Sequence, residues 1–418
     1  MAVVGTKTNS ASVGDIFFDV AGARSEPYTP WRVQSVNIHG EAEWVIHSPP
    51  DVAKATGVSE HDTAIIQNAY AASADNHIKV DDSESPLVLA EGGAVQFAQG
   101  ARISPLRGRR ARIQLKNNGG GTPTEIWIGD FHDPNTAKSG YIAASVGDGG
   151  RSITAAGHTL VEGDLGLLIS DDSISSVHPH LGTGGDTRPL EMFKVRRVDG
   201  TKLWLEKPLR DTHSVNVLMG QLKIDGTGDN PVATICSIED INFTGSDNGS
   251  TGSSTNQRGV VFLVCDNPRM TNCIVRHTGH VGAQFCYSPN IDDCLIGPMV
   301  NAERHYGINL TCCDDAQIQR CEFTGVRHGF TTGAEAGGLV RWGTNGDIRL
   351  IDCVGYVTGL QDTDTSSVMF SEHPESLHLE YLRCKVISAG DSATGGVGVS
   401  TIGFTARGRN TRYTQCSF

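Results

Sequence analysis

The chain has 418 residues, of which 50 are glycine and 11 are cysteine, and only 6% are aromatic. This composition is typical of short strands joined by many turns, and it excludes long helical bundles and coiled coils. The net charge of −13 argues against a broad phosphate-binding surface, so we expect no nucleic-acid partner. No apolar run reaches the length of a membrane span, and the first residues lack a signal-peptide pattern. We therefore expect no membrane partner.

The N-terminal region contains two segments of different character. Residues 1–50 match no motif, and we assign them to a separate small N-terminal segment. In residues 62–73, DTAIIQNAYAAS, the apolar side chains share one helical face, with Asp62 in front of them. This pattern predicts a short amphipathic helix that has Asp62 as its N-cap.

The middle of the chain predicts a β insertion. Residues 160–213 contain apolar strand patterns on both sides of Asp199 and Gly200, which favour a hairpin with a type I′ turn. The segments 171–189 and 246–258 are rich in glycine, serine and other polar residues, which is typical of loops.

The 11 cysteines follow a repeat. All of them lie between Cys236 and Cys416, and none forms a C-x-x-C motif, so zinc and thioredoxin sites are not indicated. Three pairs have a spacing of eight residues: Cys265 and Cys273, Cys286 and Cys294, Cys313 and Cys321. The second members begin a series that continues at intervals of 21 to 32 residues: Cys273, Cys294, Cys321, Cys353, Cys384 and Cys416. Intervals of this length are typical of solenoid coils.

Stacked coils place the same position of each repeat one above another, about 4.8 Å apart. The repeat therefore predicts an all-β fold, a parallel β-helix, with a buried ladder of reduced cysteines inside it. No metal or other cofactor is indicated.

Three segments resemble a known family. DTAIIQNAYAAS resembles the capping helix that opens pectate-lyase-like right-handed β-helices. GDLGLLIS, followed by FKVRRVDGTKLWLEKPLRD, resembles a segment of phage tailspike and appendage β-helices, and GINLTCCDDAQIQRCEFTGVRHGFTTG resembles their repeat coils. The likeness covers residues 51–418. It implies a right-handed single-stranded parallel β-helix, with its capping helix near 62–73 and a β insertion near 160–213.

The resemblance also implies a function. A protein of this family is a virion-associated homotrimeric spike, made in the host cytoplasm, which binds and often depolymerises a bacterial surface polysaccharide. Residues 1–50 would attach it to tail or head proteins of the virion. The chain departs from the family at GVSEHDT, which lacks the usual Gly-Asp-Gly, and its last coil has no cap. We expect a partner chain to cover that coil.

Three successive coils begin a strand with basic residues, which predicts a cationic patch: His280, Arg304, His305, Arg327 and His328. Arginine can hold the carboxylate of a uronate or sialic acid with two hydrogen bonds, and we expect His280, Arg304, Arg327 and Trp342 to bind the substrate. In a β-elimination, His305 or His328 would take the C5 proton and Tyr306 would act as the acid.

Other chemistries and functions remain open at this point. Hydrolysis needs two carboxyl groups, and the candidates are Glu303, Glu335, Asp362, Asp364 and Glu372, of which Asp362 and Asp364 are expected to adjoin the patch. If the histidines and arginines only bond turn carbonyls, the same fold is a non-catalytic structural or adhesin protein of a virus particle. A bacterial pectate-lyase-like polysaccharide lyase is the remaining alternative.

Overall fold

The structure is a computed structural model of the chain. It describes residues 16–18, 30–36, 42–46, 52–53, 55, 59–82, 85–89, 94–116, 124–130, 140–174, 186–223, 232–245, 258–299, 306–333, 335–337, 340–357, 368–373, 375–388, 402–405 and 408–417.

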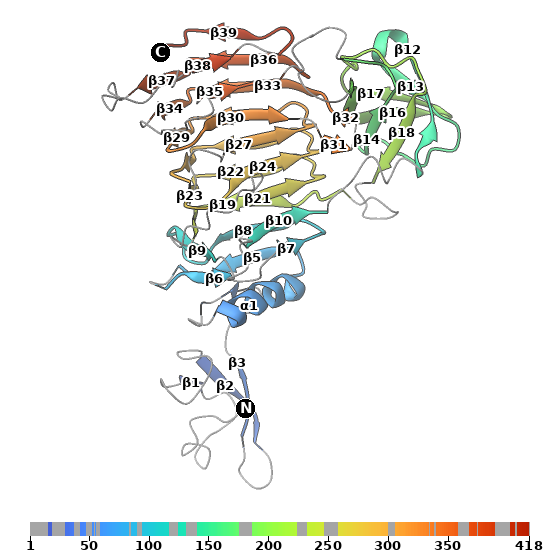
Figure 1. The fold of residues 1–418 in the computed structure, drawn as a ribbon. Coiled ribbons are helices and arrows are strands. Elements are labelled where there is room, and N and C mark those ends of the chain that lie inside the picture. Colours follow the sequence, from blue (N-terminus) through green and yellow to red (C-terminus); the bar gives the residue numbers. More distant parts are fainter. Residues whose placement is uncertain are drawn as a thin grey trace.

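The described chain forms a parallel β-helix, which confirms the predicted fold (Figure 1). Each coil contributes one strand to each of three parallel sheets. Sheet I contains β4 (Val52–Ala53), β5 (His77–Val80), β8 (Ala101–Pro105), β19 (Cys236–Glu239), β22 (Arg269–Thr271), β25 (Asn290–Asp292), β28 (Gln317–Gln319), β33 (Asn345–Ile351), β36 (Ser376–Leu382) and β39 (Arg412–Thr414). Sheet II contains β6 (Leu87–Leu89), β9 (Ala111–Leu115), β20 (Ile241–Gly245), β23 (Ile274–Arg276), β26 (Leu295–Ile296), β29 (Glu322–Thr324), β34 (Val354–Val357) and β37 (Lys385–Ser388). Sheet III contains β7 (Ala94–Phe97), β10 (Glu125–Gly129), β21 (Arg258–Leu263), β24 (His280–Gln284), β27 (Tyr306–Thr311), β30 (His328–Gly333), β35 (Val368–Ser371) and β38 (Ile402–Thr405).

Helix α1 (Ser59–Ala72) packs across the first coil (Figure 1). Ile66 and Ala69 are buried on its inner face, as the apolar periodicity indicates. The helix begins before Asp62, so the prediction that Asp62 is the N-cap is wrong. Its carboxylate is fully buried and accepts a hydrogen bond from the backbone N–H of Val88, 2.8 Å away. The side chain therefore ties the helix to strand β6.

The turn between sheets I and II, here called the open corner, holds the long cysteine series. In each coil a residue with φ between 49° and 57° precedes the inward residue: Asp240, Asn272, Asp293, Arg320, Asp352, Arg383 and Gln415. The thiols of Cys273, Cys294, Cys321, Cys353 and Cys384 are buried and free, and each lies 3.4–3.7 Å from a carbonyl oxygen of the preceding coil. The predicted ladder is confirmed. Burial raises the pKa of the Cys321 thiol, which keeps it protonated.

The turn between sheets III and I, here called the covered corner, holds a second ladder: Cys265, Cys286 and Cys313. The residues before these cysteines also have positive φ, 49° at Val264, 52° at Phe285 and 53° at Cys312. The spacing of eight residues is thus the length of chain that joins the two corners. The adjacent pair Cys312 and Cys313 separates, because Cys313 joins the ladder and the thiol of Cys312 bonds the carbonyl of Trp342, 3.3 Å away.

An antiparallel domain is inserted between β10 and β19 and flanks the upper coils (Figure 1). Its strands, with a 3₁₀ turn at Asp148–Gly150, form one seven-stranded sheet: β11 (Ile142–Ala143), β12 (Ser145–Gly147), β13 (Ser152–Thr154), β14 (Leu165–Ile169), β16 (Leu190–Asp199), β17 (Lys202–Leu205) and β18 (Leu218–Leu222). The sheet spans 142–222 and so exceeds the expected 160–213 at both ends. The hairpin turn is Gly200-Thr201, where only Gly200 has a positive φ. This conformation fits a type II′ turn and not the expected type I′ turn.

The inserted domain leaves and rejoins the β-helix at neighbouring points of one coil. Gly129 pairs with Leu263, and Ala233 pairs with Cys265, so the two ends lie over residues that are two positions apart. A further strand, β15 (Asp186–Arg188), pairs with β32 (Val340–Trp342), which pairs with β31 (Glu335–Gly337).

The inserted domain packs on the covered corner. Val264, Phe285 and Cys312 are at most 2% exposed, and they join one apolar cluster with residues of the inserted sheet such as Leu167 and Met192. Their positive φ turns these side chains away from the β-helix core, in which the next residue of each coil lies. The backbone of the repeat thus builds an apolar platform for the second domain.

Near the N-terminus the backbone forms an antiparallel sheet of β1 (Ile16–Phe18), β2 (Pro30–Val36) and β3 (Ala42–Ile46). Within the described residues, no helix is both long and apolar enough to cross a membrane.

Candidate functional site

A column of polar side chains lies at the starts of four adjacent strands of sheet III. The register pairs Arg258 with His280 and Tyr306 with His328, on strands β21, β24, β27 and β30. The ring of Tyr306 stacks on that of His328 at a centroid distance of 5.1 Å, and it lies 6.2 Å from the ring of His280. The structure therefore brings together three of the predicted residues, His280, Tyr306 and His328.

Glycines in the strands permit this arrangement. Gly329 follows His328, and a Cβ atom there would lie 2.8 Å from Cγ of the buried Phe323. Gly307 follows Tyr306 and is similarly close to the Phe323 ring. Only glycine lets the strand pass so close to this ring.

The column is only partly open to solvent. His280 is 4% exposed, His328 is 7% exposed, and Tyr306 is half-buried. Nδ1 of His328 donates a hydrogen bond to the carbonyl oxygen of Val368, 2.7 Å away, in the next coil. This bond fixes the orientation of the ring and, in the neutral imidazole, makes Nε2 the basic nitrogen.

The other predicted site residues have different positions. Arg327 directly precedes the column strand β30 and is half-buried; its Nε has no hydrogen-bond partner among the described residues. Trp342 does not lie with the column, because it is 3% exposed in the apolar cluster under the inserted domain. Five predicted residues lie outside the described residues: Glu303, Arg304, His305, Asp362 and Asp364.

The sequence patterns missed a carboxyl group at the lower end of the column. Glu125, on β10, accepts hydrogen bonds from Nε1 of Trp127 at 2.7 Å and from the backbone N–H of Arg258 at 3.2 Å. The guanidinium of Arg258 lies 5.9 Å from the centre of the Trp127 ring. Burial raises the pKa of Glu125 despite these donors. No local pattern reveals this contact, since 133 residues separate Glu125 from Arg258.

A second charged cluster joins the two domains. Arg210 of the inserted domain bonds Asp314 and lies 2.9 Å from Asp347 and 3.5 Å from Glu191, whose other oxygen lies 3.1 Å from Nε2 of His213. Burial raises the pKa of Asp314 to about 7. The cluster links the two domains, because Arg210 and Glu191 belong to the inserted domain and Asp314 and Asp347 to the β-helix.

Glu372, one of the carboxyl candidates for hydrolysis, follows β35 at the end opposite the column. It is fully buried and accepts hydrogen bonds from Oγ1 of Thr411 at 2.7 Å and from the hydroxyl of Tyr413 at 3.2 Å. These contacts tie Glu372 to the last described coil, which favours a structural role for this carboxyl group. Within the described residues, no cluster of histidine, cysteine, aspartate and glutamate side chains could hold a metal ion.

Comparisons with known proteins were made by sequence and by structure. No protein-family profile matches the chain, and no curated protein matches it by sequence. The tailspike protein gp49 from Pseudomonas phage LKA1 is similar in structure, with a TM-score of 0.60 and 18% identity over 85% of this chain and 52% of that protein.

Two further tailspikes are similar. The gp54 tailspike of Acinetobacter baumannii bacteriophage AP22, solved in complex with an A. baumannii capsular saccharide, has a TM-score of 0.55 and 13% identity over 85% of this chain and 50% of that one. The tailspike gp61 of Pseudomonas phage phi297 has a TM-score of 0.53 and 15% identity over 82% and 59%. The chain spans about half the length of the tailspikes that it matches. It therefore has the parallel β-helix fold that is found in phage tailspikes.

Proposed function

We propose that the chain is the β-helix of a phage tailspike and that it binds an acidic bacterial surface polysaccharide along the column of sheet III. The observation that carries this proposal is the alignment of Arg258, His280, Tyr306 and His328 on adjacent strands. The similarity to tailspikes, one of them solved with a capsular saccharide, supports a polysaccharide as the ligand.

The column has the chemistry that an acidic glycan requires. Arg258 and Arg327 can each hold a carboxylate with two parallel hydrogen bonds, and the buried Nε of Arg327 gains an acceptor when it does so. The ring of Tyr306 is stacked on His328 and only half-buried, so its exposed edge and its hydroxyl remain available to a sugar.

We also propose that the column cleaves the bound polysaccharide by β-elimination. An imidazole takes the C5 proton of a uronate, the bond from C4 to the glycosidic oxygen breaks, and the leaving oxygen takes a proton from Tyr306. The product carries a C4–C5 double bond. His328 suits the role of base because the bond from Nδ1 to the Val368 carbonyl leaves Nε2 basic.

A non-catalytic adhesin is the second candidate function. The same hydrogen bond to Val368, together with the low exposure of both histidines, favours a structural role for the imidazoles. In that case the column binds glycan and breaks no bond.

The test uses Tyr306→Phe, which keeps the stacked ring and removes the hydroxyl. Tyr356→Phe is the matched control, because Tyr356 is exposed on β34 in another sheet. The protein is incubated with a panel of capsular polysaccharides, and unsaturated uronate is followed by its ultraviolet absorbance. We expect Tyr306→Phe to lower the rate by at least about a hundredfold and Tyr356→Phe to leave it unchanged.

Other outcomes of this assay separate the alternatives. Binding without fragments supports the adhesin. Fragments without the ultraviolet band support hydrolysis, in which case Glu125→Gln should abolish cleavage, since a carboxyl group with a raised pKa suits a general acid. Absence of binding to every polysaccharide would refute the proposed function.

The homotrimer and the attachment of residues 1–50 to the virion stay predictions. Light scattering tests the first of these, because a trimer has about three times the 44.5 kDa mass of one chain.

A further inference from the structure

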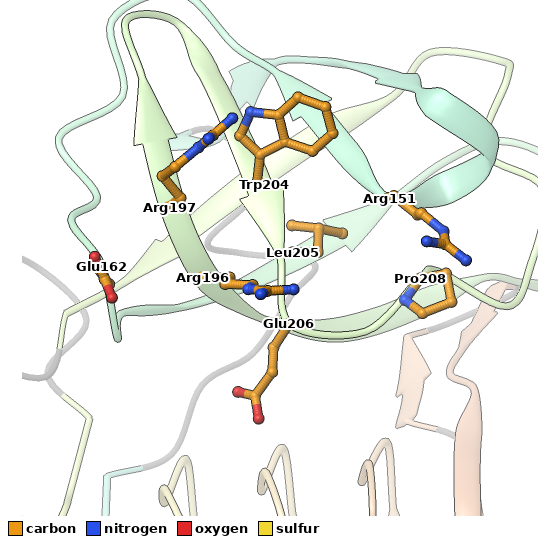
Figure 2. A pocket seen from close by; sticks show the side chains of 8 residues that line it. All are labelled: Arg151, Glu162, Arg196, Arg197, Trp204, Leu205, Glu206 and Pro208. Atoms are coloured by element: carbon orange, nitrogen blue, oxygen red, sulfur yellow. The ribbon is translucent and has the colours of Figure 1, made fainter.

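The inserted domain contains a pocket that lies apart from the column of sheet III. Its volume is about 720 Å³, within the usual range for small-ligand sites. Strands β16 and β17 form it together with the segment that follows β17, with Arg151 just before β13 and with Glu162, and Figure 2 shows the side chains that line it. Three of these side chains are arginines: Arg151, Arg196 and Arg197.

Two of the arginines, Arg196 and Arg197, are consecutive in sequence and both line the pocket because of a β-bulge. The register between β16 and β17 shifts between Val195 and Arg197, so Arg196 is the extra residue. A bulge changes the direction of the side chains next to it, and here it lets two consecutive arginines line one pocket. Within the described residues, no ion pair is formed by Arg151, Arg196 or Arg197. Unpaired guanidiniums on a protein with a net charge of −13 indicate an anion site.

The half-buried Trp204 carries a second, independent sign of a ligand. The guanidinium carbon of Arg197 lies 5.2 Å from the centre of its ring, and Figure 2 shows that guanidinium beside the nitrogen-bearing end of the ring. The indole Nε1 is buried and has no hydrogen-bond partner among the described residues. Two donors thus lie side by side, and one carboxylate could accept from both once the atoms that cover the indole Nε1 move aside.

The remaining lining residues indicate a saccharide and not a simple ion. Glu162 and Glu206 are exposed in the wall, and Figure 2 shows both apart from Trp204. A simple anion is repelled by carboxylates, whereas the hydroxyl groups of a sugar donate hydrogen bonds to them. Trp204 and Pro208 offer apolar surface to a sugar ring.

We propose that this pocket binds a carboxylate-bearing saccharide unit through Arg151, Arg197 and Trp204. The site goes beyond the function proposed above, because it stands on another domain and uses none of the residues of the column.

The test titrates the full chain with glucuronic acid and with glucose at low salt, by isothermal titration calorimetry. We expect Arg151→Gln/Arg197→Gln to weaken the binding of glucuronic acid at least tenfold, and Trp204→Phe to weaken it as well. The matched control is Arg107→Gln/Arg109→Gln, which removes the same charge from an exposed turn of the β-helix. It should change the affinity less than twofold. Arg197→Gln alone serves as a second variant if the double variant has an altered melting temperature.

Two further titrations separate the proposals. A Tyr306→Phe/Arg258→Gln protein should keep the high-affinity binding of glucuronic acid, so a failure of the column leaves this site intact. Equal affinity for glucose, equal affinity for inorganic phosphate, or no loss in the Arg151/Arg197 variant would refute the pocket as an acidic-saccharide site.

Discussion

The two corners of the β-helix use the same backbone and present opposite surfaces. At both corners a residue with positive φ precedes a cysteine that points into the core. At the open corner this residue is polar, as with Asp293, Asp352 and Arg383, and it faces water. At the covered corner it is Val264, Phe285 or Cys312, and it lies beneath a second domain. The backbone of the repeat thus sets the direction of a side chain, and the residue type decides what it meets.

Carboxylates at the two corners differ in the same way. Asp352 is paired with Arg383 at 2.6 Å near the surface, and this bond lowers its pKa. Asp314 bonds Arg210 beneath the inserted domain, where burial outweighs the pairing and raises the pKa to about 7. Pairing at the surface therefore lowers the pKa of a turn carboxylate, whereas burial beneath a second domain raises it toward neutral pH.

The largest effect is expected from Phe285→Ala, which removes a fully buried ring from the covered corner. We expect the free energy of unfolding in urea to fall by about 3–5 kcal/mol. Phe285→Gly is the matched variant, because glycine adopts the positive φ of 52° without strain and should recover a part of the loss. A loss below about 1 kcal/mol would mean that packing of the inserted domain does not stabilise the β-helix.

Asp314→Asn tests the covered carboxylate through pH. Folded Asp314 keeps a proton that the unfolded chain releases between about pH 4 and pH 7, so the free energy of unfolding should fall as the pH rises through this range. Relative to Asp314→Asn, the wild type should lose on the order of 2 kcal/mol between pH 5 and pH 8. Asp352→Asn is the control, since a lowered pKa affects stability only below about pH 4. Parallel curves for wild type and Asp314→Asn would contradict the assignment.

Cys321→Ser probes the cysteine ladder of the open corner. The hydroxyl replaces a buried thiol that lies 3.3 Å and 3.6 Å from two carbonyl oxygens, and we expect a loss of about 1–2 kcal/mol in chemical denaturation. Cys416→Ser, at the half-exposed end of the ladder, should cost less. Equal losses of unfolding free energy in the two variants would show that burial of the thiol does not determine its contribution to stability.

The smallest effect is expected from Arg383→Ala at the open corner. Its ion pair with Asp352 is exposed to solvent, and such pairs contribute little because water and salt screen them. The melting temperature of the variant should match that of the wild type in 0.5 M salt. A clear drop that persists at this salt concentration would place the open corner among the main sources of stability.

The repeat could be predicted from the sequence because six coils carry a cysteine at the same inward point of the open corner, and these cysteines mark the length of each coil. The separation of Cys312 from Cys313 could not be predicted, since it depends on the φ angle of Cys312. The sequence around Phe285 and Trp342 likewise does not reveal that both side chains lie in the apolar cluster under the inserted domain.

The candidate site was predictable to the extent that it follows the repeat. His280, Tyr306 and His328 occupy equivalent positions of successive coils, so stacking brings them together. Glu125 escaped notice because it belongs to a coil that precedes the insertion, and its neighbour Arg258 belongs to one that follows it. Local pattern also failed at Asp62, whose partner Val88 is distant in sequence.

The β-helix is interrupted after Gly129 and resumes at Ala233. These two residues pair with Leu263 and Cys265, so a single residue could bridge the gap between them. The coil is therefore complete without the domain, and a shortened chain need not shift the register of any strand above or below. Any module whose ends lie about as far apart as alternate residues of one strand could occupy this position. This position of the β-helix is therefore an insertion point, at which one recognition domain could be exchanged for another while the β-helix stays the same.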